Sequence, residues 1–138
     1  MNTILDLNYN PITIIKGTRY SAGFDIPLDI KENVKLDKYV KLIPTGIKLD
    51  LNYNYHAVII PRSSTGIKKN IHMINGLIDS DYKGQLFLQC YKIIDDDVYI
   101  EKNDYIAQLL IYKNENINNK IVIINNNDRG INGFGSTH

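Results

Sequence analysis

The sequence predicts an all-β fold, and three observations lead to this prediction. Short apolar or alternating runs recur along the chain, with turn-forming residues between them. No segment keeps its apolar residues at a helical period over several turns. The chain has 138 residues, 43% of them hydrophobic, which suits one compact domain with a real core. Many short strands with few helices indicate a sandwich, a barrel or a jelly roll.

The expected strands follow one another from near the N-terminus to residue 124. The run 24–30 contains Pro27, which cannot donate to a sheet ladder, so we expect an edge or bulged strand there. One helical turn is expected at residues 63–68, where a serine could cap the start. The full set of expected strands is 12–15, 24–30, 40–43, 47–51, 57–60, 71–78, 85–94, 98–100, 105–112 and 121–124.

Composition and charge exclude several classes of protein. The formal net charge is +1, whereas a general nucleic-acid binder would normally show a strong basic excess. The single cysteine, Cys90, lies in an apolar run, which predicts a buried, inert thiol and no intramolecular disulfide. The chain shows no signal-peptide pattern and no stretch near the roughly 20 apolar residues of a membrane helix. We therefore expect a soluble, cytoplasmic protein that binds neither nucleic acid nor a membrane.

The segment from residue 125 onward differs from the rest of the chain. Its first residues are polar, and Arg129 to His138 contains three glycines, one arginine, one aromatic residue and two hydroxyls. A frayed terminus is the plain alternative. Glycine N–H groups and an arginine fork would instead suit phosphate oxygens, and Phe134 would offer a face to a base. We expect a β domain at 1–124 that carries a flexible C-terminal lid at 125–138.

Two further segments carry polar groups that a ligand could use. Residues 62–64, Arg-Ser-Ser, lead into the helical turn, whose N–H groups favour anions; a capped helix beside a surface arginine is the alternative. Residues 76–84 look like a hairpin with two acids and one tyrosine at its tip, and a solvated turn is the alternative there. Asp79 directly follows apolar residues at a strand end, where its side chain can be held firmly.

Two single polar residues complete the pattern. Gln108 is the polar residue of an otherwise apolar strand, and a buried glutamine must be hydrogen-bonded to protein or to a ligand. Asp25 follows the glycine turn at Gly23, and an ordinary turn carboxylate is the alternative. Each of these five features alone is weak evidence for a ligand site, so the inference rests on their order along the chain.

The five segments, in this order, resemble the trimeric dUTP diphosphatase (dUTPase) family. The resemblance runs from about Ser21 to the C-terminus, and its most specific parts are residues 76–84 and 129–137. It implies a jelly-roll-like β domain and a homotrimer with three active sites, each assembled from all three chains. The tail of one subunit would reach a site formed by the other two.

The reaction that the resemblance implies is hydrolysis of dUTP to dUMP and pyrophosphate. This reaction keeps uracil out of DNA and supplies dUMP for dTMP synthesis. Asp79 would be the catalytic base that holds and deprotonates the attacking water, and a free aspartate with a pKa of about 3.9 is ionised at neutral pH. Mg²⁺ would chelate the three phosphates, and Asp25 would contact the ion through water.

The resemblance also implies three sets of substrate contacts. The α- and β-phosphates would be contacted by Arg62, Ser63, Ser64 and Gln108. The γ-phosphate would be held by Arg129, Ser136 and Thr137, with backbone groups from Gly133 to Gly135. The uracil would be covered by Phe134 and read by the backbone of Gly76, Leu77 and Ile78, with Phe87 on the second hairpin strand. Tyr82 would pack under the sugar and leave no room for a ribose 2′-hydroxyl.

Two alternatives stay open. A dCTP deaminase shares this fold but needs a glutamate general base five residues past the closing glycine of the hairpin, where this chain has Gln89. A non-catalytic module of the same fold would bind a nucleotide or a protein partner without turnover. The chain departs from the usual family pattern, without losing a catalytic group, at Met73, Tyr105, Asn132 and His138.

Overall fold

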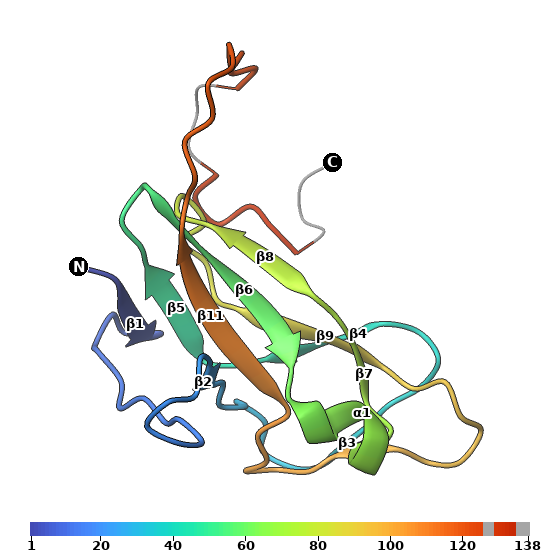
Figure 1. Cartoon of the computed structure of the whole chain (residues 1–138). Coiled ribbons are helices and arrows are strands. Elements are labelled where there is room, and N and C mark those ends of the chain that lie inside the picture. The colour runs from blue at the N-terminus through green and yellow to red at the C-terminus, as the bar shows by residue number, and fades with distance from the viewer. Residues whose placement is uncertain (126–128, 135–138) are drawn as a thin grey trace.

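The computed structural model describes residues 1–125 and 129–134, and it confirms an all-β fold with one short helix in these ranges (Figure 1). Helix α1 is Ser63–Lys69. The strands are β1 Thr3–Asp6, β2 Phe24–Asp25, β3 Val34–Lys35, β4 Lys41–Pro44, β5 Ile47–Asp50, β6 Tyr55–Pro61, β7 His72–Ile74, β8 Gly76–Asp79, β9 Phe87–Tyr91, β10 Tyr99–Ile100 and β11 Ala107–Lys113. No helix of the described ranges is long and apolar enough to cross a membrane.

Two larger antiparallel sheets and two short ribbons make up the fold. One sheet has the strand order β2-β11-β6-β8 and the other β4-β9-β7, while β1 pairs with β5 and β3 with β10. The longest ladder joins β6 to β11, from Tyr55 opposite Lys113 to Pro61 opposite Ala107. These two strands run side by side through the molecule in Figure 1, and the site residues lie around their ends.

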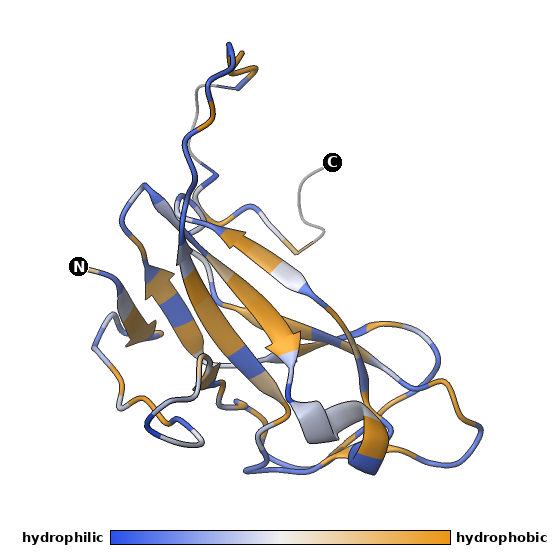
Figure 2. Cartoon of the chain, in the orientation of Figure 1, coloured by the Kyte–Doolittle hydropathy of each residue, from blue (hydrophilic) through white to orange (hydrophobic). Residues whose placement is uncertain are grey.

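The core is one cluster of side chains to which both larger sheets contribute. Ile59 and Leu109 come from one sheet, Ile43 and Leu88 from the other, and each is at most 1% exposed. Hydrophobic residues concentrate in the strands, whereas the loops mix hydrophilic and hydrophobic residues (Figure 2). Burying one such aliphatic side chain contributes roughly 1.5–3 kcal/mol, so this cluster stabilises the frame that carries the site.

Most predicted strands are present with shifted ends, but two predictions were wrong. In the run 12–15, Ile15 makes only an isolated bridge to Asp25. Residues 121–124 form no strand, and their four aliphatic side chains are 63–96% exposed. A row of β-branched residues is typical of a strand, yet a strand also needs a pairing partner. No described residue of the chain pairs with this segment.

Helix α1 begins where a helical turn was predicted, but no serine caps it. Its N-cap residue is Arg62, which makes no side-chain capping bond. The N–H of Arg62 donates to the carbonyl oxygen of Ile106 at 3.0 Å, which keeps the chain extended up to this residue and moves both serines inside the helix. Buried Thr65 ties the helix down, because its Oγ1 donates to the same carbonyl at 2.6 Å.

The predicted strand 71–78 is two strands that belong to different sheets. β7 pairs with β9, and after Asn75 the chain crosses over so that β8 pairs with β6. The expected closed hairpin at 76–84 is therefore wrong, since no pairing between β8 and β9 occurs in the described chain. β8 satisfies its backbone groups on β6 instead, where buried Ile78 lies opposite buried Ala57. The turn after Asp79 links the two larger sheets, because β8 before the turn belongs to one sheet and β9 after it belongs to the other.

Candidate active site

Arg62 and Asp25 meet where β6 ends. Arg62 follows the last residue of β6, and its Nε lies 3.4 Å from Asp25 Oδ1. Its Nη1 donates to the carbonyl oxygen of Tyr105 at 3.2 Å. The side chain of Asp25 is 12% exposed and that of Arg62 37%. The guanidinium is therefore fixed on one side and open to a ligand on the other.

Gln108 lies beside this pair on β11. It is the register partner of Asp25 on one side and of Ile60 on the other. Its Nε2 donates to the carbonyl oxygen of Pro61 at 3.3 Å, which meets the expectation that this amide is hydrogen-bonded. A Cβ at Gly23 would come within 2.5 Å of Gln108 Oε1. The amide of Gln108 can therefore occupy this position only if residue 23 is a glycine. Ser63 and Ser64 follow directly in the first turn of α1. We call Asp25, Arg62, Ser63, Ser64 and Gln108 the Arg62 group.

Asp79 is the last residue of β8, and its carboxylate is paired. Asp79 Oδ2 lies 2.7 Å from Nη2 of Arg129, and the two side chains are 44% and 42% exposed. An ion pair this exposed adds little to stability. It brings together, however, the two side chains for which the sequence predicted the water-activating role and a phosphate-binding role.

A pocket of about 210 Å³ opens where β8 and β9 separate. Phe134 forms one wall, and its ring stands edge-on to those of Tyr82 and Phe87, with ring centroids 5.5 and 5.6 Å apart. Burial raises the pKa of Tyr82, whose Oη donates to the carbonyl oxygen of Gln85 at 2.6 Å. The pocket is lined by Asn75, Gly76, Leu77, Ile78, Tyr82, Gln89, Arg129, Gly133 and Phe134.

Residues 129–134 of the tail lie on the turn after β8 of their own chain. Arg129 N–H donates to Asp81 Oδ2 and Gly130 N–H to the Asp81 carbonyl oxygen, each at 2.9 Å. Lys83 N–H donates to the carbonyl oxygen of Gly130. The resemblance implied a tail placed over a neighbouring subunit. These contacts all lie within one chain, so the placement of the tail over a neighbouring subunit stays a prediction.

The Arg62 group and Asp79 lie at opposite ends of β6. His56, near the start of the strand, is opposite Asp79, whereas Arg62 follows the strand's last residue. A strand rises about 3.3 Å per residue, so six residues separate the two by roughly 20 Å. Figure 1 shows the same arrangement, with the end of β8 far from α1. One chain therefore does not bring all the predicted site residues together.

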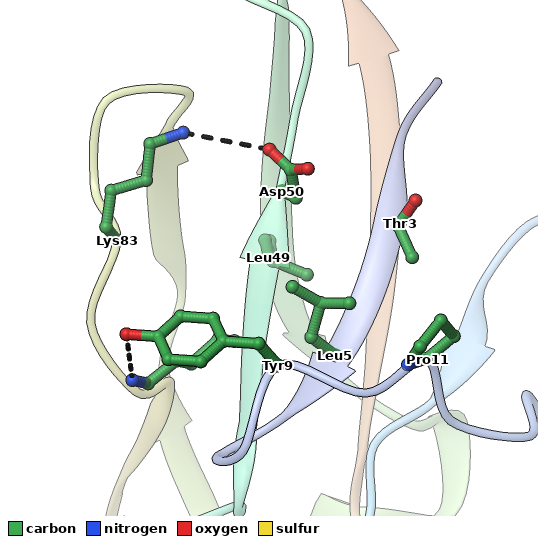
Figure 3. Close-up of a pocket in the computed structure, with 8 residues that line it drawn as sticks. Thr3, Leu5, Tyr9, Pro11, Leu49, Asp50 and Lys83 are labelled. Atoms are coloured by element: carbon green, nitrogen blue, oxygen red, sulfur yellow. Dashed lines mark hydrogen bonds and ion pairs between the residues drawn. The ribbon is translucent and has the colours of Figure 1, made fainter.

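A larger pocket, of about 460 Å³, lies between the N-terminal segment and β5 (Figure 3). Its lining residues are Thr3, Leu5, Tyr9, Pro11, Lys48, Leu49, Asp50 and Lys83. Both lysines of this pocket already have polar partners: Lys48 donates to Tyr9 Oη at 3.1 Å, and Lys83 lies 4.0 Å from Asp50. None of the predicted site residues lines this pocket, and the smaller pocket beside Asp79 is the better candidate despite its size.

The structure adds two residues that were not predicted to bind substrate. Gln89 lines the smaller pocket, whereas Phe87, two residues earlier on the same face of β9, contacts the ring of Phe134 and is not among the lining residues. The spacing of Gln89 from Phe87 was a signal that could have found it. Asn75 lines the pocket at the crossing between β7 and β8, and a lone amide inside an apolar run was its signal. The predicted residues Gly135, Ser136 and Thr137 lie outside the described residues.

The available carboxylates fit only one kind of magnesium site. No group of three or more His, Cys, Asp or Glu side chains suited to a metal ion occurs within 1–125 and 129–134. Mg²⁺ commonly keeps several waters and binds through one or two carboxylates plus substrate phosphates. The single carboxylate of Asp25, next to Arg62, fits an ion held mainly by a triphosphate, and it does not fit a cage built by protein alone.

Comparison with known proteins decides the family. A family model described as dUTPase matches residues 10–138. The chain belongs to the dUTPase family. A deoxyuridine 5′-triphosphate nucleotidohydrolase of Finegoldia magna is 33% identical over 138 residues, covering 97% of this chain and 96% of the relative. Another, from Fusobacterium nucleatum, is 36% identical over 124 residues, with 87% and 85% covered.

Solved dUTPase structures share the fold of this family member. The dUTPase of Streptococcus mutans matches with a TM-score of 0.71 at 23% identity, over 85% of this chain and 99% of the other. A dUTPase mutant of Staphylococcus bacteriophage 80alpha with dUpNHpp matches with a TM-score of 0.69 at 23% identity, over 99% and 97%. The predicted jelly-roll-like dUTPase fold is confirmed.

Proposed function

We propose that this member of the dUTPase family hydrolyses dUTP to dUMP and pyrophosphate, which keeps uracil out of DNA and supplies dUMP for dTMP synthesis. One observation carries the proposal: the carboxylate of Asp79 lies next to a pocket of about 210 Å³ and is paired with an arginine of the tail. The curated relatives that match nearly the whole chain carry the name of this activity.

Asp79 is the proposed general base. Its place at a strand end fixes the carboxylate, and its exposure leaves room for a water molecule. The water oxygen forms a bond to the α-phosphorus, the bond from that phosphorus to the bridging oxygen of pyrophosphate breaks, and Asp79 takes the proton. A carboxylate is a weak base at neutral pH, so in-line placement of the water supplies much of the acceleration. Arg129 must first leave Asp79, and the substrate phosphates are its alternative partner.

The proposed uracil site is the pocket between β8 and β9. Uracil presents O4 as an acceptor and N3–H as a donor, whereas cytosine reverses both. The backbone of Gly76, Leu77 and Ile78 can read this difference, since a buried unsatisfied group costs about 1–3 kcal/mol. Phe134 would cover the base, with Phe87 behind it, and a thymine 5-methyl group would meet the pocket wall. Tyr82, fixed by its bond to Gln85, would fill the space of a ribose 2′-hydroxyl.

The phosphates would be bound by the Arg62 group from one side and by the tail from the other. Arg62 is the preferred phosphate ligand, because a guanidinium can make two parallel hydrogen bonds. The tail would add Arg129, Ser136 and Thr137, with the backbone at Gly135. Asp25 would contact the water shell of a Mg²⁺ ion on the phosphates. When bound, this ion offsets negative charge on the departing pyrophosphate.

The complete site is proposed to form only between subunits of a homotrimer. The separation of Asp79 from Arg62 supports this, because roughly 20 Å of strand β6 lies between their backbones within one chain. The exposed aliphatic row 121–124 also supports it, since large exposed apolar patches mark interaction surfaces. The buried free thiol of Cys90 favours a reducing compartment, the cytoplasm, for the reaction.

Product release from four nucleotides tests the proposal. We expect pyrophosphate from dUTP in the presence of Mg²⁺ and at least about 100-fold slower release from dCTP, dTTP and UTP. Ammonia is measured in the dCTP reaction, and its release would establish a deaminase and overturn the proposal. Gln89, at the position of the deaminase glutamate, argues for no ammonia because an amide is not a general base. Binding of dUTP without release of pyrophosphate would make the chain a binding module.

A further inference from the structure

We infer that Asp81 is a positioning residue that anchors the C-terminal tail to the active site, an inference that rests on the proposed roles of Asp79 and Arg129. Asp81 lies two residues after Asp79, in the turn that leaves β8. It accepts two consecutive N–H groups of the tail, one with its side chain and one with its backbone. The sequence pattern gave this second acid of the turn no role.

The anchor has a defined geometry. Asp81 Oδ2 accepts the Arg129 N–H and the Asp81 carbonyl oxygen accepts the Gly130 N–H, each at 2.9 Å. Gly130 has a φ of 63°, in the left-handed region, which turns its carbonyl oxygen toward the N–H of Lys83. Tyr82 and Gly130 then form a parallel bridge. The tail thus joins the turn by three backbone N–H donors, and only one of their acceptors is a side chain.

The hydrogen bond to the Asp81 carboxylate is the contact that fixes the backbone of Arg129. Its N–H is held by Asp81, while its guanidinium lies 2.7 Å from Asp79 on the same turn. The anchor does not depend on where the guanidinium points, so Arg129 can exchange Asp79 for a substrate phosphate about a fixed backbone. Asp81 therefore acts through Arg129 and Phe134 and touches neither the base nor the phosphates.

A carboxylate suits this task better than the alternatives. A backbone N–H bond to a charged acceptor is stronger than one to a neutral acceptor. Asparagine would keep an acceptor oxygen without the charge, and alanine would keep only the backbone acceptor. The order of tail anchoring should then be wild type, Asp81→Asn and Asp81→Ala.

Limited proteolysis by trypsin tests the anchor without any nucleotide. Trypsin cleaves after Arg129 only when the tail leaves the turn, whereas cleavage after Lys120, in the exposed segment, serves as an internal reference. We expect Asp81→Ala to speed cleavage after Arg129 by about tenfold, Asp81→Asn to do so less, and neither to change cleavage after Lys120. The matched control is Asp96→Ala, an exposed aspartate of the β9–β10 loop. An unchanged rate after Arg129 in Asp81→Ala would overturn the inference.

Kinetics of a chain without the tail distinguish an anchoring role of Asp81 from a general structural role in the turn. In the full chain, Asp81→Ala should lower kcat/KM for dUTP by about tenfold. In a chain that ends at residue 128, the same substitution should change neither the residual kcat/KM nor the melting temperature, because its partner is absent. Equal losses in both backgrounds would show that Asp81 supports the turn itself and contradict the anchor. If wild type does not hydrolyse dUTP, the proposed function fails while the proteolysis result still decides the anchor.

Discussion

Asp79 and Arg62 belong to one chain but lie at opposite ends of strand β6. Asp79 is the register partner of His56 near the start of the strand, and Arg62 follows Pro61 at its end. This separation supports the proposal that the base and the phosphate ligand of one substrate come from different subunits. In that proposal the oligomer takes part in the chemistry, which gives the first prediction.

Mixed oligomers of two inactive variants should regain activity. Asp79→Asn removes the base and Arg62→Gln removes the phosphate ligand, so each variant alone is expected to be inactive. After unfolding and refolding of an equal mixture, about a quarter of the sites should combine an intact Asp79 with a neighbour's intact Arg62. Pyrophosphate release from dUTP measures the recovery. An inactive mixture that has refolded as mixed oligomers would show that each chain uses its own Arg62.

Gly133 allows the tail to approach Tyr82, so a methyl group there should displace the tail. A Cβ at this position would lie 2.8 Å from Tyr82 Cε1, and that ring is buried and hydrogen-bonded. Gly133→Ala is expected to lower kcat/KM for dUTP by about 10–100-fold and to leave the melting temperature unchanged. Gly66→Ala is the control, since a Cβ there meets nothing within 4 Å and should add about 0.5–1 kcal/mol of stability. Normal kcat/KM in Gly133→Ala would contradict the tail contact.

Gly23 makes room for the Gln108 amide, so substitutions at the two positions should impair the same function and should not be additive. A Cβ at Gly23 would come within 2.5 Å of Gln108 Oε1 and force the amide away from Pro61. We expect Gly23→Ala and Gln108→Ala each to raise KM for dUTP, and the double variant to be no worse than Gln108→Ala alone. Steady-state kinetics of the three variants measure this. Fully additive losses would show that Gly23 does not act through Gln108.

The thiol of Cys90 should make stability fall at high pH. Burial raises the pKa of Cys90 from 9.0 to about 12. Above about pH 9 the unfolded thiol ionises while the folded one keeps its proton, so the free energy of unfolding falls by about 1.4 kcal/mol per pH unit until about pH 12. Below pH 9 this component is constant. Urea denaturation at pH 8 and 10.5 should show wild type losing about 2 kcal/mol more than Cys90→Ala. An equal loss of unfolding free energy in wild type and Cys90→Ala would contradict a buried thiol with a raised pKa.

The strands that are clearly apolar were predictable from the sequence, whereas the pairing of strands was not. Residues 57–60 and 105–112 were predicted as strands because their apolar side chains suit a sheet, and β6 and β11 confirm both. The run 71–78 was predicted as one strand, although it contains Asn75-Gly76, a dipeptide typical of turns, and the chain passes from one sheet to the other at this point. The row 121–124 has strand chemistry but finds no partner among the described residues.

The candidate site was predictable in its residue types but not in its grouping. Local patterns marked Asp79 and Arg62 only as candidates, a carboxylate at a strand end and an arginine before a helical turn, and the resemblance to the dUTPase family supplied their roles. Their separation along β6 depends on sheet register, which the local patterns do not contain. Asn75 and Gln89 were missed as pocket residues, since the pocket exists only because β8 pairs with β6 and leaves β9.

Turnover of dUTP by wild type and by Asp79→Asn tests the proposed function most directly. Asparagine keeps the shape of the side chain but cannot take a proton. The account predicts pyrophosphate release by wild type, a kcat at least about 100-fold lower in the variant, and dUTP binding by calorimetry that is no weaker than in wild type. Wild-type turnover that survives in Asp79→Asn would contradict the role of this carboxylate.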